Sequence, residues 1–74
     1  AQALARELHP KNIHIGHCVI DGGIRADYRP ERKGDGNDNM LDPDAIAETY
    51  LQMHDQHRSA WSWEIELRPW VEKF

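Results

Sequence analysis

The fold of this chain is decided by residues 12–24, which read NIHIGHCVIDGGI. Branched apolar side chains recur through this stretch, at Ile13, Ile15, Val19 and Ile20. An apolar run of this length that closes in an acid and two glycines is typical of a buried strand. We therefore expect a strand over residues 12–20 inside a parallel sheet, with a neighbouring element approaching closely at Gly16.

The turn that follows this strand, Asp21-Gly22-Gly23, is the first candidate for a functional site. In open parallel sheets, ligands bind just beyond the carboxyl ends of the strands. An ordinary turn is the alternative interpretation of the same three residues.

Residues 42–58 are expected to form one amphipathic helix. Asp42 can cap its free amide groups, and Pro43 suits the first helical position. The residues that recur at helical spacing along one face are Ile46, Tyr50, Met53 and His57. This face is expected to pack on a sheet.

Residues 60–68 show strict alternation between apolar and polar side chains. The apolar members are Trp61, Trp63, Ile65 and Leu67. This period of two predicts a strand with one dry face near the edge of a sheet, which Pro69 would end. Residues 69–74 follow as an apolar tail that we expect to dock on another surface.

Between the first strand and the helix lie residues 25–40, which are rich in charged residues, asparagine and glycine. They carry little apolar material for a core of their own. Loops of this length act as lids or binding loops, or are disordered, and both interpretations remain open.

These segments together predict an α/β fold built on a βαβ unit with two parallel strands. Residues 1–10 would be the end of a flanking helix. No Ser, Thr, Asp or Asn precedes this helix as a cap, which indicates either a processed or frayed terminus or the loss of residues before Ala1. Residues 1–74 are then a single unit, the C-terminal segment of a larger domain.

Composition excludes several classes of function. The net charge is −4, with nine basic and thirteen acidic residues, so neither a nucleic acid nor an anionic membrane is an expected partner. No stretch approaches the roughly 18 apolar residues of a membrane span. Cys18 is the single cysteine, which rules out an internal disulfide and suits the reducing cytoplasm.

Metal binding is a rival interpretation of the histidines. His14, His17 and Cys18 lie close in sequence, and His54 and His57 share a helix face. Strand residues three apart point to opposite faces, so His14 and His17 would diverge, and no recognised ligand spacing is met. No metal site is expected.

Three segments together resemble the C-terminal third of a short-chain dehydrogenase/reductase, in a divergent branch of that family. ARELHPKNIHIGHCVIDGGI, residues 5–24, resembles the end of the helix after the catalytic tyrosine, the sixth sheet strand and the following turn. LDPDAIAETYLQMHDQ, residues 41–56, resembles the helix before the last strand, and SAWSWEIELRP, residues 59–69, resembles that strand. The family's Pro-Gly turn and its Val-Asp-Gly-Gly ending are absent here.

The resemblance implies an oxidoreductase with a doubly wound, Rossmann-like sheet and an NAD or NADP cofactor. By resemblance, the residues that would border the nicotinamide are Ile20, Asp21, Gly22, Gly23 and Ile24. Residues 25–40 would close over the substrate as a lid. The helix and the last strand would form a sheet edge, which in this family commonly makes a subunit interface.

The family's catalytic and phosphate-binding motifs are not in this sequence. No Gly-x-x-x-Gly-x-Gly occurs, and Tyr28 and Tyr50 are followed four residues later by Arg32 and His54, not by lysine. We therefore expect no catalytic residue here, and neither cofactor binding nor reductase activity by this chain alone.

A small α/β interaction module without catalysis is the alternative function. Its two strands would leave apolar surface and unpaired sheet edges. Such a module would form homo-oligomers through the sheet edge and through Trp61, Trp63 and Trp70.

Overall fold

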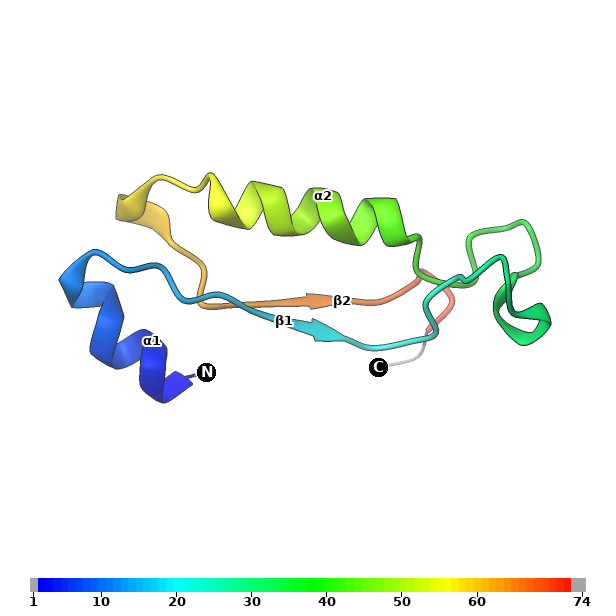
Figure 1. The fold of residues 1–74 in the computed structure, drawn as a ribbon, viewed down its shortest axis with the longest axis horizontal. Helices are drawn as coiled ribbons and strands as arrows, with labels where there is room; N and C mark the ends of the chain where they lie inside the picture. Colours follow the sequence, from blue (N-terminus) through cyan, green and yellow to red (C-terminus); the bar gives the residue numbers. More distant parts are fainter. Residues whose placement is uncertain (1, 73–74) are drawn as a thin grey trace.

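The computed structural model describes residues 2–72 (Figure 1). In chain order its main elements are α1 (Gln2–Leu8), β1 (His17–Ile20), α2 (Pro43–His54) and β2 (Glu64–Leu67). Short 3-10 turns lie at His9–Lys11, Pro30–Arg32 and Arg58–Ala60. In Figure 1, α2 runs along one side of the strands, and α1 lies on the other side near their starts. Residues 73–74 of the expected tail lie outside the described range.

β1 and β2 pair in parallel, in a register that places His17 opposite Glu64. At the carboxyl end the Asp21 N–H extends the ladder by donating to the Leu67 carbonyl at 2.9 Å. Parallel strands need a long crossover, which the loop and α2 supply here. The predicted arrangement of two parallel strands joined through a helix is confirmed.

α2 packs its inner face on the sheet at two points. A Cβ at Gly16 would overlap the Sδ of Met53, so only glycine fits beneath this side chain. The close approach predicted at Gly16 is therefore confirmed. Closer to the start of the helix, electrostatic repulsion from Cys18, together with a hydrogen bond to it, raises the pKa of Tyr50. Cys18 of β1 thus faces α2.

Different hydrogen bonds determine where α2 begins and where it ends. Asp42 is the N-cap, as predicted, and its Oδ1 accepts the Asp44 N–H at 3.2 Å. The helix ends at His54, earlier than the predicted residue 58. The reason is that His57 Nδ1 accepts the Ser59 N–H at 3.1 Å and caps a separate 3-10 turn.

Both strands are shorter than the sequence predicts. The first strand was expected over residues 12–20, but backbone amides before His17 form hydrogen bonds with partners outside the sheet. The Ile13 N–H donates to the Leu8 carbonyl at 3.1 Å, and the Ile15 N–H donates to His9 Nε2 at 3.0 Å. These bonds connect the segment to the end of α1, so its amides do not enter the ladder.

The tryptophans before β2 depart from the predicted alternation. Trp61 stacks on His14, with ring centroids 4.6 Å apart and planes 3° apart, and its Nε1 donates to the Gln56 carbonyl at 3.1 Å. Trp63 lines a depression against α1. The predicted strand over residues 60–68 therefore shrinks to β2. The view that His14 and His17 share one strand is also wrong, because His14 precedes β1.

Burial is sparse across the described residues. Among residues 2–72, Ala5 and Met53 are buried, at 4% and 5% exposure, and Pro69 is buried as well. The radius of gyration is 14.9 Å and the chain spans 45 × 22 × 19 Å. A compact domain of this length would have a radius of gyration of about 11 Å. The unit is therefore elongated, and many of its apolar side chains are only partly covered.

The N-cap predicts a specific stability loss. Replacing Asp42 with alanine should lower the free energy of unfolding by about 1 kcal/mol, because an amide of the first turn of α2 loses its acceptor. Asp42→Asn keeps an oxygen at the same place and should cost less. Urea unfolding followed by far-UV circular dichroism measures both variants. Equal losses for alanine and asparagine would contradict the capping role.

Candidate functional site

The candidate site lies where β1 and β2 end. In Figure 1 the carboxyl ends of both strands and the start of α2 meet at the same end of the molecule. β1 ends at Ile20, and the turn from Asp21 to Ile24 follows immediately. The structure thus places all five predicted turn residues together at the end of the sheet where open parallel sheets bind ligands.

Asp21 is held by the end of the neighbouring strand. Its Oδ2 lies 3.4 Å from Arg68 Nη1, and the same guanidinium also pairs with Glu66. The Arg68 side chain is only 13% exposed, so it is shielded better from solvent than an ordinary surface ion pair. Asp21 therefore ties the end of β1 to the end of β2. Sequence analysis missed this pair, because the two residues are 47 positions apart.

The two glycines of the turn serve different purposes. Gly22 has φ +138°, a region that only glycine adopts readily, and a Cβ there would lie 2.7 Å from Pro69 Cδ. Gly23 needs no such conformation, and a Cβ there would meet only Met40, at 3.7 Å. Gly22 is therefore required for packing against Pro69, whereas Gly23 leaves the backbone open.

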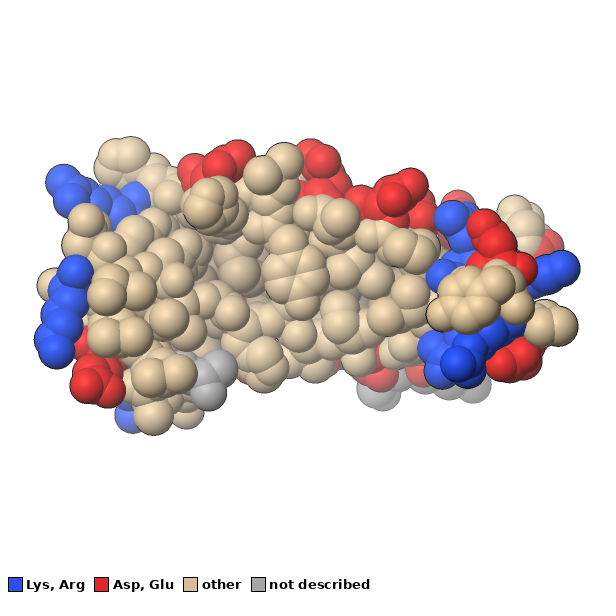
Figure 2. Space-filling view, in the orientation of Figure 1, with Lys and Arg blue, Asp and Glu red and all other residues tan. Residues whose placement is uncertain are grey.

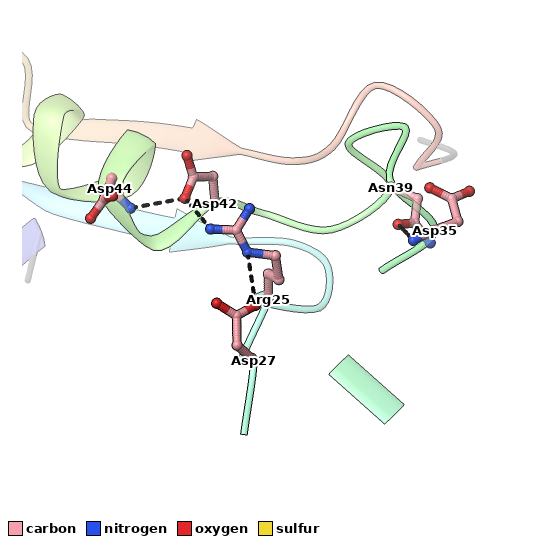
Figure 3. A network of polar contacts seen from close by, with 6 residues as sticks. All are labelled: Arg25, Asp27, Asp35, Asn39, Asp42 and Asp44. Atoms are coloured by element: carbon pink, nitrogen blue, oxygen red, sulfur yellow. Dashed lines mark hydrogen bonds and ion pairs between the residues drawn. The ribbon is translucent and has the colours of Figure 1, made fainter. Parts of the chain in front are cut away.

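The loop of residues 25–40 is closed at its base. Ile24 and Leu41 form a parallel bridge, with the Leu41 N–H donating to the Gly23 carbonyl and the Arg25 N–H to the Leu41 carbonyl, both at 2.8 Å. The Arg25 side chain reinforces this closure, since its Nη2 donates to Asp42 Oδ1 at 3.1 Å (Figure 3). The loop is a compact excursion whose ends are joined, of the kind that frequently carries function.

Further hydrogen bonds give the loop a defined shape. The Asp35 N–H donates to Asn39 Oδ1 at 2.8 Å, and the Asn37 N–H donates to Asp35 Oδ1 at 2.8 Å. Trp70 Nε1 then donates to the Asn37 carbonyl at 2.9 Å. The tail thus contacts the tip of the loop, and these hydrogen bonds favour an ordered loop over a disordered one, while its role as a lid or binding loop stays a prediction.

The first part of the loop lines a cavity of about 650 Å³ that is open to solvent. Pocket volumes of this order hold small molecules. Ile24, the last residue of the predicted turn, is also part of the cavity wall. The full lining is Ile24, Arg25, Ala26, Asp27, Tyr28, Arg29, Arg32 and Pro43. Sequence analysis did not single out these arginines, because their convergence depends on the path of the loop.

Residues 2–72 show neither a cluster of metal ligands nor a helix suited to a membrane. His14 and His54 line one shallow depression, but no group of three or more His, Cys, Asp or Glu in the described range is placed to hold a metal ion. Within the same range, none of the helices has the length and apolar character needed to cross a bilayer.

These observations define a class of structure. It is an α/β unit that carries a turn and a closed loop at the carboxyl end of its strands. No protein-family model matches the chain, and no curated protein matches it. Among solved structures, it is similar to a short-chain dehydrogenase from Rhodopseudomonas palustris, with 39% sequence identity and a TM-score of 0.63. The match covers 93% of this chain and 24% of that chain.

The match supports the resemblance inferred from the sequence at a coarse level. Nearly the whole of this chain is similar, in sequence and in fold, to part of a short-chain dehydrogenase. The chain spans about a quarter of that enzyme's length. The assignment to a divergent branch of the family stays a prediction.

The turn predicts a contrast between its two glycines. Gly22→Ala should lower the free energy of unfolding by about 1–3 kcal/mol, because alanine is strained at this φ and would clash with Pro69. Gly23→Ala, one residue later, should change stability little, since its Cβ would make only ordinary contacts. Urea denaturation of the two variants tests this. A loss at Gly23 as large as that at Gly22 would refute the assignment.

Proposed function

We propose that this chain is the C-terminal portion of an NAD(P)-dependent oxidoreductase of the short-chain dehydrogenase/reductase type. The observation that carries the proposal is the 39% identity to such an enzyme over 93% of this chain. The parallel βαβ unit, with its turn at the carboxyl end of β1, agrees with the role that the resemblance assigns to it.

The uncovered edges and face of the sheet support the proposal that this chain is part of a larger domain. Among residues 2–72 the sheet has two strands, and their outer edges are unpaired within that range. Parallel sheets normally have both faces covered and occur inside larger α/β folds. Figure 2 shows that the middle of one face of the molecule carries no Lys, Arg, Asp or Glu. Further strands and helices of a Rossmann-like, doubly wound sheet would cover these edges and this face.

In this proposal the turn forms one wall of the cofactor site. Ile20 and Ile24 contribute half-buried apolar side chains, and Gly23 carries no side chain, so a flat nicotinamide ring could lie against the turn. These residues fit one wall and not a complete site. The cofactor would supply the hydride, and this chain's residues would position the ring and exclude water from it. Residues 25–40 would act as the substrate lid.

The proposal is tested in the complete open reading frame that contains residues 1–74. We expect that protein to oxidise NADH or NADPH with a carbonyl substrate, measured by absorbance at 340 nm, and the 74-residue chain alone to be inactive. Ile24→Ala should raise KM for the cofactor about tenfold, a loss of ~1.4 kcal/mol in binding. Ile13→Ala, the same change in the segment that precedes β1, is the matched control.

Two results would count against the proposal. One is a complete protein without hydride transfer to any of a broad panel of aldehydes and ketones. The other is an equal change of cofactor KM in the Ile24 and Ile13 variants, which would indicate a general loss of stability.

Self-association is the second candidate function, and exposed aromatic surface favours it. Trp61 and Trp63 are half-buried by contacts within the chain, whereas Trp70 is 76% exposed. Exposed apolar patches commonly mark interaction surfaces. We propose a homo-oligomer contact that includes Trp70 and the sheet edge, with Trp61 and Trp63 contributing their remaining exposed atoms.

This contact predicts concentration-dependent association of the 74-residue chain. Light scattering coupled to size-exclusion chromatography should show dimers or larger species at micromolar concentrations. Trp70→Ser should weaken the association about tenfold, because the exposed indole loses its contact. Tyr28→Ser removes an aromatic side chain that is 83% exposed but lies outside the proposed surface, and should have no effect. A monomer at all concentrations would exclude this function.

A further inference from the structure

The first part of the loop, residues 25–33, carries an excess of positive charge, although Asp35 and Asp38 bring the whole loop of residues 25–40 to neutrality. Four of the nine Lys and Arg residues lie within residues 25–33, against two acids, in a chain whose net charge is −4. Figure 2 shows Lys and Arg side chains, interspersed with Asp and Glu, at the end of the molecule that this loop forms. The local charge therefore opposes the charge of the whole chain.

These cations converge on the cavity of about 650 Å³ in the first part of the loop. Arg25, Arg29 and Arg32 all line it, together with Tyr28. The path of the backbone brings them together, because the Ala26 N–H donates to the Arg32 carbonyl at 2.8 Å. The 3-10 turn Pro30–Arg32 lies within this closed segment.

The three guanidinium groups differ in how far they are already neutralised. Arg25 is committed to the base of the loop, since it contacts Asp42 at 3.1 Å and Asp27 at 3.6 Å. Arg29 has one long ion pair, to Glu31 at 3.9 Å on an open surface, which binds it weakly, and its guanidinium lies 5.8 Å from the centre of the Tyr28 ring. Arg32 forms no ion pair with any residue from 2 to 72. Two of the three arginines are therefore available to a ligand.

We propose that this cavity binds an oxyanion, a carboxylate or a phosphate carried by the substrate, through Arg29 and Arg32. A guanidinium presents a planar fork of donors that matches both kinds of oxyanion. The Tyr28 hydroxyl, on the same wall, would add a further donor. Arg25 acts as a positioning residue, because its ion pairs fix the base of the loop that carries the other two.

The position of the cavity connects it to the proposed cofactor site. Ile24 belongs both to the turn and to the cavity wall, so a molecule in the cavity would lie beside the turn. The assignment of the anion to a substrate rests on the proposed oxidoreductase function. The binding of an oxyanion by the arginines does not.

The test is a calorimetric titration of the complete protein with inorganic phosphate and, separately, with succinate, at constant ionic strength set by sodium chloride. We expect saturable binding of at least one anion. Arg32→Gln should weaken it about tenfold, and Arg29→Gln serves as a second variant at the same cavity. Arg6→Gln, an equal loss of charge on α1 at the opposite end of the molecule, should leave the affinity unchanged.

The relative affinities identify the source of the anion. Tighter binding of phosphate indicates a phosphorylated substrate, and tighter binding of succinate indicates a carboxylic acid. The proposal is overturned if neither anion binds, or if Arg6→Gln weakens binding as much as Arg32→Gln. Far-UV circular dichroism confirms that each variant is folded.

The outcome is separable from that of the proposed function. If the protein binds anions through Arg32 but transfers no hydride, the anion site is supported and its assignment to a substrate is rejected. If the protein transfers hydride but binds neither anion, the oxidoreductase function is supported and the anion site is refuted.

Discussion

The parallel pairing of β1 with β2 is the constraint on which the rest of this structure depends. Because both strands run the same way, the chain must return along the full length of the sheet between them, and α2 makes that return. The carboxyl ends of both strands and the start of α2 therefore meet at one end. Three contacts join them there: Arg68 with Asp21, Gly22 with Pro69, and Arg25 with Asp42.

The same constraint explains why so little of the chain is buried. One helix can cover only one face of a two-stranded sheet, and α1 reaches the other face only near the start of the strands (Figure 1). Stability of small units depends on the apolar area that they bury. A unit with this geometry buries little apolar area by itself, and its similarity spans about a quarter of a longer chain.

Features that depend on local chemistry were predictable from the sequence. The cap at Asp42 requires only an acceptor before a helical segment, and Gly16 signals close packing wherever its partner comes from. The strand ends were not predictable. Trp61 fits a period of two in the sequence, yet His14 offers its ring a stacking partner and Gln56 accepts its N–H. The ring contact comes from the distant His14 and the hydrogen bond from the nearby Gln56, and together they compete with strand pairing at Trp61.

The sequence by itself determined the element types, the parallel βαβ order and the place of the turn after the first strand. These follow from apolar periodicity, glycine and proline positions and capping residues, all of which act over a few residues. Only the tertiary structure decided which charges meet. Arg25 finds Asp42 across 17 positions because the loop closes, and the same closure gathers the arginines around one cavity. Such long-range pairs depend on the path of the whole backbone, which no local pattern records.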